Sequence, residues 1–209
     1  AKSTKINCPN CIKEGYVHRT EFVTCEQMEH TDQFQKEVYQ KARQVCDQNS
    51  YKTILDIGCG SAFKLANYFR DKNIIGLELE PNLSFIRKKY PLYDFRESDF
   101  NNPPEDEIDL VICSDVVEHL LEPDELMHFM TKINFKTLVL STPERSAIQR
   151  LQRVFGWQVQ ENGPPYNKMH VREWSFEELN RYVSDFFNVE HQYMCPIQKE
   201  CQVVIATKK

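Results

Sequence analysis

An acidic residue and two glycines follow a short apolar run in ILDIGCGSA, residues 54–62. Asp56 stands near the end of the run, and Gly58 and Gly60 precede a helical pattern. Glycine is needed where the backbone turns sharply or where a Cβ would collide with a ligand. A strand that passes through such a loop into a helix is typical of a nucleotide-binding turn. Phe63 stands where the NAD fingerprint requires glycine, which argues against a dinucleotide dehydrogenase.

Four residues near the N-terminus are of types that bind zinc. Cys8 and Cys11 have the spacing of half a zinc site, and His18 and Cys25 would complete four ligands. No second close cysteine pair follows them. Exposed thiols on an irregular arm are therefore the favoured interpretation, with zinc as the alternative.

Hydrophobic periodicity indicates the elements that must position these residues. A helix is expected from Thr31 or Asp32 to about residue 48, because apolar residues recur along it with helical period. Apolar runs then alternate with helical patterns, which predicts a parallel α/β sheet. The expected strands are 53–58, 73–79, 93–99, 110–115 and 137–142, and the expected helices are 61–71, 82–89 and 122–133.

The C-terminal part of the chain has its own pattern. Ser175 and Glu178 form a capping box, which predicts a further helix over the sheet. Strand-like residues 187–194 and 202–208 are separated by a short segment that suits an antiparallel hairpin. The stretch 143–174 is too long for an ordinary connection and is therefore expected to be a functional loop.

Composition narrows the class of protein. A length of 209 residues favours one decorated domain, and the formal charge of −5 argues against a dedicated nucleic-acid-binding domain. No apolar run approaches the length of a membrane span, and no secretory signal opens the sequence. Eight cysteines are below disulfide-scaffold density, so we expect free thiols and a cytoplasmic location.

The glycine loop and the strand ends together resemble the class I S-adenosylmethionine-dependent methyltransferases. The loop matches the first motif of that family, with Ala62 in place of its last glycine. Glu78 ends the next strand, 22 residues after Asp56, where the family places an acid. Asp99 with Phe100, LVICSDVVEHL (110–120) and STPER (141–145) match the following strand ends.

This resemblance implies a fold and a division of the chain. The fold would be α/β and Rossmann-like, with a mostly parallel seven-stranded sheet, an antiparallel last strand and helices on both faces. Residues 1–30 would form an N-terminal arm or lid, and 31–209 the methyltransferase domain, with 143–174 as an insertion on the acceptor side.

The resemblance also implies a cofactor and the residues that hold it. S-adenosylmethionine would be the methyl donor and S-adenosylhomocysteine (SAH) the product. Asp56 would position the loop and the amino group of the ligand, and the two loop glycines would admit its methionine portion. Glu78 would hold the ribose, and Asp99 with Phe100 the adenine. Ser114, in the fourth-strand segment, is assigned to the same cofactor site.

A less specific resemblance connects the chain to methyltransferases that tailor surface polysaccharides and small molecules. Its matching pieces include TDQFQKEVY (31–39) and GPPYNKMHVREW (163–174). The helix with Gln35 and Tyr39 would fold over the cofactor, and the second segment would lie near the transferred methyl. The acceptor is then a small molecule, such as a sugar or a phosphorylated polysaccharide precursor, rather than a nucleic acid or a membrane.

Methyl transfer to a hydroxyl requires an aligned acceptor and a group that removes a proton. His170 is the first candidate for that catalytic base, and His119, at the end of the fourth strand, is the second. A hydrogen-bonded structural role is the alternative for each. Tyr166, Asn167 and Arg172 are candidate acceptor contacts, although Arg172 has nearby glutamates to pair with.

Three other functions stay open at this point. Asp115, Glu118 and His119 resemble the segment by which ubiquinone-pathway O-methyltransferases hold a divalent ion, which gives a metal-assisted quinol or catechol methyltransferase; a site without metal is preferred. An N-methyltransferase acting on an amino sugar needs no strong base. A non-catalytic accessory protein with this fold is disfavoured, because the whole set of cofactor residue types is present.

Overall fold

The computed structural model describes residues 11–18, 25, 33–159 and 161–209. Seven strands form one sheet in the order β3-β2-β1-β4-β5-β7-β6. The strands are β1 Thr53–Ile57, β2 Asn73–Glu78, β3 Asp94–Glu97, β4 Ile108–Ser114, β5 Phe135–Pro143, β6 Phe187–Met194 and β7 Cys201–Lys208. Strands β3, β2, β1, β4 and β5 are parallel to one another, whereas β7 is antiparallel to both β5 and β6. The predicted mostly parallel seven-stranded sheet is therefore confirmed.

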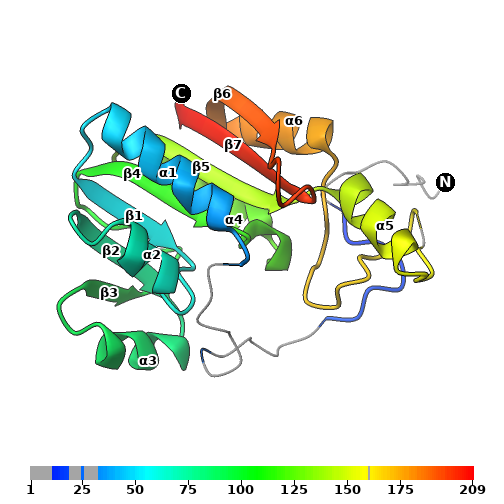
Figure 1. The fold of residues 1–209 in the computed structure, drawn as a ribbon, viewed down its shortest axis with the longest axis horizontal. Helices are drawn as coiled ribbons and strands as arrows, with labels where there is room; N and C mark the ends of the chain where they lie inside the picture. The colour runs from blue at the N-terminus through cyan, green and yellow to red at the C-terminus, as the bar shows by residue number, and fades with distance from the viewer. Residues whose placement is uncertain (1–10, 19–24, 26–32, 160) are drawn as a thin grey trace.

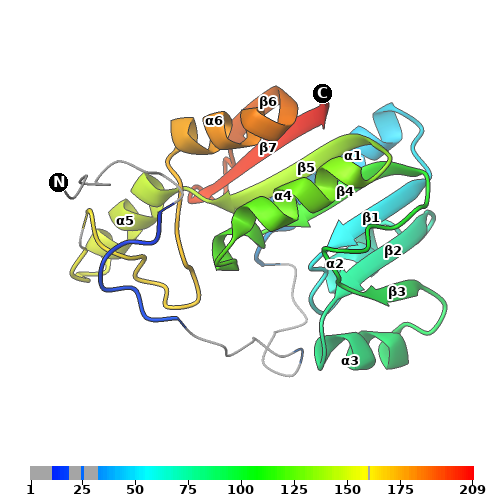
Figure 2. The same ribbon diagram turned by 180° about the vertical axis from the view of Figure 1, so that it is seen from behind.

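Helices cover both faces of this sheet. They are α1 Lys36–Gln48, α2 Phe63–Tyr68, α3 Asn82–Lys89, α4 Pro123–Lys132, α5 Arg145–Val154 and α6 Phe176–Phe186, with a short 3-10 turn at Val117–His119. Figures 1 and 2 show α1 and α2 on one face, and α4 and α6 on the other. Helix α5 projects beyond the end of the sheet rather than covering it.

The central strands are short apolar runs because both of their faces are covered. Two hydrophobic clusters result, one beneath α4 and α6 and one beneath α1, α2 and α3. Trp174 and Phe129 are fully buried in the first cluster, and Phe69 in the second. The rigid sheet fixes the carboxyl ends of its parallel strands at one edge, where ligands of α/β folds bind.

Local sequence signals set several element boundaries. The side chain of Ser175 accepts a hydrogen bond from the Glu178 backbone N–H, and Glu178 accepts one from Ser175, so the predicted capping box is present. The predicted β6–β7 hairpin is also present. In the described parts of the chain, no helix is both long and apolar enough to cross a membrane.

Two boundary predictions were wrong. Helix α1 begins at Lys36, with Gln35 as its N-cap in a left-handed conformation (φ 62°), and not at the expected Thr31 or Asp32, which lie outside the described residues. The stretch 143–174 is not a plain loop, because it contains α5. Glu144 caps α5 by accepting a hydrogen bond from the Ala147 backbone N–H, a signal that sequence analysis missed.

Candidate functional site

The loop after β1 is built around positive backbone φ angles. Gly58 has a φ of +70°, and a Cβ added there would stand 2.6 Å from the Val116 side chain. Gly60 has a φ of 55°, and Ala62, which replaces the third glycine, has a φ of 54°. The Gly58 N–H donates to the Leu77 carbonyl at 2.9 Å, which fixes the loop against β2. The first glycine is thus required both by conformation and by space.

Asp56 is a buried carboxyl with one oxygen that has no partner. Its Oδ2 accepts a hydrogen bond from the Tyr39 hydroxyl at 2.7 Å, whereas Oδ1 has none within the described chain. Burial raises the Asp56 pKa to about 7, although the Tyr39 hydrogen bond acts in the opposite direction. A buried acceptor without a hydrogen-bond donor lowers the stability of the fold, and a ligand that supplies the donor removes this cost. A cationic amino group fits this position.

Glu78 stands at the end of β2 beside the glycine loop. Its Oε2 accepts a hydrogen bond from the Gly60 N–H at 2.6 Å, and its Oε1 accepts one from the Leu79 N–H at 2.9 Å. A carboxylate offers about four lone-pair sites, so two remain for further donors. The group is mostly buried, and burial raises its pKa. Glu78 thus fits two ribose hydroxyls while it also holds the loop.

Asp99 and Phe100 follow β3, as the sequence predicted, but both already have protein partners. The Asp99 carboxylate accepts hydrogen bonds from the Asn101 backbone and side chain and from the Asn102 side chain, which lowers its pKa. The Phe100 ring lies 5.2 Å from the Phe129 ring, centroid to centroid, at the edge of the core beneath α4. Their geometry therefore suits a structural turn as well as it suits an adenine site.

A hydrogen-bonded chain joins Gln35 and Ser114. The Gln35 amide donates to Asp115 Oδ2 at 3.0 Å, and the Ser141 hydroxyl donates to Asp115 Oδ1 at 2.9 Å. Ser141 Oγ lies 2.8 Å from Ser114 Oγ. The chain ties the start of α1 to the ends of β4 and β5. Ser141 was matched only as part of the segment 141–145 and was given no role of its own, because a serine inside an apolar strand carries no distinctive signal.

One described residue of the N-terminal arm lies at the glycine loop. Cys25 is 1% exposed, its backbone N–H donates to the Asn82 side chain at 2.8 Å, and its Sγ lies 3.7 Å from the Gly60 carbonyl oxygen. In the zinc hypothesis, Cys8 falls outside the described residues. Cys11 lines a cavity beside Arg172 instead, and among the described residues no group of possible metal ligands includes Cys11, His18 or Cys25.

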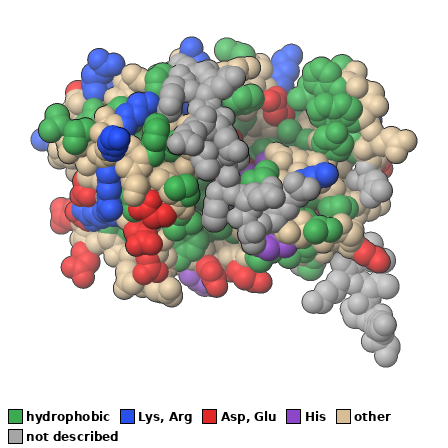
Figure 3. Space-filling model, turned by 90° about the horizontal axis from the view of Figure 1, so that it is seen from below, with side chains coloured by type: hydrophobic (Ala, Val, Ile, Leu, Met, Phe, Trp, Pro, Cys, Tyr) green, Lys and Arg blue, Asp and Glu red, His purple; other side chains and the backbone are tan. Residues whose placement is uncertain are grey.

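The two predicted histidines come together although they are 51 positions apart. Their rings are edge to face, with centroids 5.0 Å apart. His119 Nδ1 donates to the Met169 carbonyl at 2.8 Å, and His170 Nδ1 donates to Glu173 Oε1 at 2.7 Å. Burial removes water from around the His119 ring and lowers its pKa, and the nearby His170 lowers it further. Figure 3, which views the molecule from below, shows histidine side chains at the surface of that face.

Glu118 lies under the histidine pair and is fully buried. Its Oε2 accepts from the Thr142 hydroxyl at 3.0 Å, whereas Oε1 accepts no hydrogen bond and lies 3.9 Å from His119 Nε2. Burial raises the Glu118 pKa, and the neighbouring Asp115 adds to this. Potential ligand atoms of Glu118, His119 and His170 all lie within 4.8 Å of one another. This group differs from the predicted trio, because the Asp115 oxygens face Gln35 and Ser141.

A cavity of about 270 Å³ adjoins the histidines on the side of Glu173. Three parts of the chain line it: Cys11 and Lys13, helix α5, and residues of the segment from Gln158 to Glu173. Two of the three predicted acceptor contacts, Tyr166 and Arg172, line it, and the third, Asn167, hydrogen-bonds His170 Nε2 at 3.0 Å. The alternative for Arg172, a pair with a neighbouring glutamate, is not found among the described residues. Its guanidinium donates instead to the Leu120 and Leu121 carbonyls at 2.7 and 2.8 Å.

Sequence analysis did not foresee two features of this region. It gave no role to Glu173 beyond a surface pair, although the i,i+3 spacing from His170 was a usable signal for the hydrogen bond between them. It considered Glu118 only within the disfavoured metal alternative, whereas complete burial with an unpartnered oxygen is a property of the tertiary structure alone.

Comparisons with known proteins agree with this geometry. The profile of a methyltransferase-domain family matches residues 28–191. No curated protein sequence matches the chain significantly. A methyltransferase dependent on S-adenosylmethionine from Clostridium acetobutylicum has a similar structure, at 15% identity and a TM-score of 0.64, over 85% of this chain and 93% of that one.

Magnesium protoporphyrin IX methyltransferase from Synechocystis, solved with bound SAH, is also similar, at 17% identity and a TM-score of 0.62, over 84% of this chain and 83% of that one. A methyltransferase from Aquifex aeolicus matches at 16% identity and a TM-score of 0.58, over 85% of this chain and 95% of that one. At these identities the likeness concerns the fold.

Proposed function

The chain belongs to the family of S-adenosylmethionine-dependent methyltransferase domains, and on that premise we propose that it methylates a hydroxyl group of a small polar acceptor. The observation that carries the proposal is the His170–Glu173 pair, which lies between the end of β4 and a cavity of acceptor size. A sugar or a phosphorylated precursor of a surface polysaccharide is the proposed acceptor.

The cofactor supplies an electrophilic methyl group, and the residues that would hold it fit its chemistry. Asp56 would accept a hydrogen bond from the amino group through its unpartnered Oδ1, and Glu78 would accept from the ribose hydroxyls. Gly58 and Gly60 would leave room for the methionine portion. We assign Asp99 and Phe100 to the adenine end of the site.

Three other residues proposed for the cofactor site would act mainly by positioning. Tyr39 holds Asp56 through its hydroxyl, and Gln35 holds Asp115. Ser114 joins the same chain through Ser141. Residues 1–30 would serve as a lid, which the contact of Cys25 with the Gly60 carbonyl supports, and the domain proper would run from 31 to 209.

His170 is the proposed general base. Because Nδ1 donates to the Glu173 carboxylate, Nε2 carries the lone pair of the ring, which accepts a hydrogen bond from the Asn167 side-chain amide at 3.0 Å. The acceptor hydroxyl would replace that amide and give its proton to Nε2. The carboxylate fixes the orientation of the ring and stabilises the imidazolium that forms. His119 contacts the His170 ring and would assist the same step.

The described cysteines are thiols, which supports the reducing environment of the cytoplasm as the location.

The test is acceptor-dependent conversion of S-adenosylmethionine to SAH with pools of sugars, sugar phosphates and sugar nucleotides. We expect turnover with a hydroxyl acceptor, and a loss of about 100-fold or more in kcat for His170→Ala, with unchanged SAH binding. His191→Ala, at an exposed histidine of β6, is the matched control. Full activity of His170→Ala on an amino sugar would instead identify N-methylation, because an amine needs no strong base.

A second candidate, metal-assisted O-methylation of a quinol or catechol, is favoured by one observation. Glu118, His119 and His170 place three possible ligand atoms together, and both histidines donate through Nδ1 to oxygen acceptors, which is how metal-bound histidines are oriented. His170→Ala impairs both candidates, so the chelator decides between them. Turnover that is lost on chelation and restored by Mn²⁺ supports the second candidate; turnover insensitive to chelator excludes it.

A further inference from the structure

The cavity beside α5 contains cations that the protein itself does not neutralise. Arg172 is 3% exposed, yet no carboxylate of the described chain forms an ion pair with it, and its Nε has no hydrogen-bond partner. Burial lowers the pKa of its guanidinium. A buried cation is costly unless an anion or a full set of acceptors surrounds it. Two backbone carbonyls and the face of the Trp174 ring, 5.9 Å from the guanidinium carbon, supply only part of that set.

The other charged residues of the cavity leave the same imbalance. Lys13 lines the cavity and pairs with no carboxylate among the described residues, whereas Arg145 is matched by Glu178 at 2.8 Å. Glu173 is the one acidic residue of the described lining, and its Oε1 is committed to His170. The cavity thus has two cations without a carboxylate partner in the described chain, and its one carboxylate already accepts a hydrogen bond from His170. This charge balance favours an anionic ligand.

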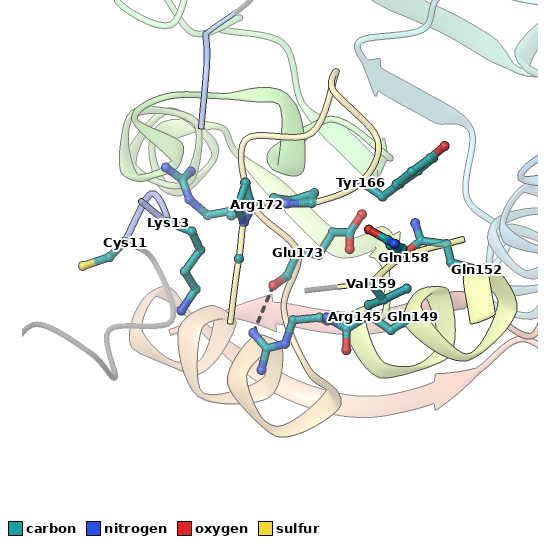
Figure 4. Close-up of a pocket in the computed structure, with 13 residues that line it drawn as sticks. Cys11, Lys13, Arg145, Gln149, Gln152, Gln158, Val159, Tyr166, Arg172 and Glu173 are labelled. Atoms are coloured by element: carbon teal, nitrogen blue, oxygen red, sulfur yellow. Dashed lines mark hydrogen bonds between the residues drawn. The ribbon is translucent and has the colours of Figure 1, made fainter. Parts of the chain in front are cut away.

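An aromatic platform borders the same cavity. The rings of Trp157 and Tyr166 are stacked, with centroids 4.7 Å apart and planes 14° apart, although they are 45% and 52% exposed. Figure 4 shows Lys13 and Arg172 on one side of the cavity and Tyr166, with Gln152 and Gln158, on the other. An exposed flat ring presents an apolar face, and side-chain amides offer both donors and acceptors.

We propose that this cavity is a subsite for a sugar phosphate, in which Lys13 and Arg172 bind the phosphate and Tyr166 packs against the sugar ring. The inference deepens the proposed function and rests on it for the role of the ligand as acceptor. Glu173 lines the cavity and accepts a hydrogen bond from His170, so a ligand bound there lies next to the residue that holds the proposed base.

The experiment is calorimetric titration of the full chain with inorganic phosphate, glucose 1-phosphate and glucose. We expect one site for glucose 1-phosphate, weaker binding of inorganic phosphate and weaker still of glucose. Lys13→Gln should weaken glucose 1-phosphate binding roughly tenfold, because it removes one charged contact. Lys168→Gln makes the same charge change on an exposed lysine of the neighbouring segment and should leave binding unchanged.

Tyr166→Ala tests the contribution of the aromatic ring to binding separately from that of the phosphate contacts. It should weaken binding of glucose 1-phosphate but not of inorganic phosphate. Arg172→Lys keeps the charge but loses the planar set of guanidinium donors, so it should weaken the binding of both phosphate ligands. This result counts only if the thermal unfolding of the variant matches that of the wild type; otherwise Lys13→Gln alone tests the phosphate contact.

The inference fails if neither phosphate ligand binds, or if Lys13→Gln and Lys168→Gln have equal effects. SAH binding, measured in the same samples, separates the two proposals. Normal SAH binding without phosphate binding overturns the subsite and leaves the proposed methyl transfer standing. Phosphate binding that depends on Lys13, in a protein without turnover on any sugar phosphate, supports the subsite as a binding site and overturns its ligand as the acceptor.

Discussion

The buried carboxyl of Asp56 should make cofactor affinity depend on pH near neutrality. Its pKa in the free protein is raised to about 7 by burial, and its Oδ1 has no hydrogen-bond partner. If the cationic amino group of the cofactor binds the ionised carboxylate, affinity follows the ionised fraction. That fraction falls from about 0.76 at pH 7.5 to about 0.09 at pH 6.0, so the affinity for SAH should fall about eightfold.

Isothermal calorimetry with SAH at these two pH values measures the effect directly. Asp56→Asn should bind SAH roughly 10- to 100-fold more weakly than the wild type at pH 7.5, and with little difference between the two pH values, because the titrating group is gone. Asp99→Asn is the control. The Asp99 pKa is already lowered by its asparagine neighbours, so this variant should retain the eightfold dependence whatever its absolute affinity.

Tyr39→Phe tests the same reasoning from the other partner. The Tyr39 hydrogen bond lowers the Asp56 pKa, so removing the hydroxyl should move the midpoint of the pH profile upward. A wild-type affinity that is flat between pH 6.0 and 7.5 would refute the assignment of Asp56 to the amino group. An Asp56→Asn profile as steep as that of the wild type would refute it equally.

Three further outcomes can be checked. Gly58→Ala should destabilise the fold by about 1–3 kcal/mol and weaken SAH binding, whereas Gly156→Ala, with a similar φ of +76° but open space around it, should lose only about 1 kcal/mol in thermal denaturation. Glu173→Gln should lower kcat and leave the KM for S-adenosylmethionine unchanged, because it frees the His170 ring without touching the cofactor; a change confined to KM would contradict the orienting role. Asp56→Asn should gain stability relative to the wild type as pH rises from 5 to 8. The pKa of Asp56 is higher in the folded state than in the unfolded chain, so the wild type loses stability as pH rises from about 4 to about 7, whereas the variant does not. Denaturant unfolding at several pH values would show this trend or its absence.

The order of elements and the cofactor loop could be predicted from local sequence alone. The apolar run at residues 53–57, the glycines at 58 and 60 and the acid at 78 are each fixed by short-range physics: burial of a strand, a positive φ angle and the end of the next strand. The capping box at Ser175 belongs to the same class, because its two hydrogen bonds lie within one turn. For such features a residue and its near neighbours contain the whole cause.

Contacts between distant segments could not be predicted in this way. Sequence analysis named His119 and His170 as separate candidates, and only the packing of the segment that follows α5 against the end of β4 places their rings in contact. The unpartnered oxygens of Asp56 and Glu118, and the unmatched charge of Arg172, are likewise visible only in the folded chain.

The physical reason is that hydrogen bonding and charge compensation depend on which groups surround an atom, and those groups come from every part of the chain. The sequence by itself determined the class of fold, the glycine loop and the types of residue available at each strand end. The tertiary structure decided which of those residues meet, which polar atoms are left for a ligand to satisfy, and that helix α5 forms a wall of a cavity beside His170 and Glu173.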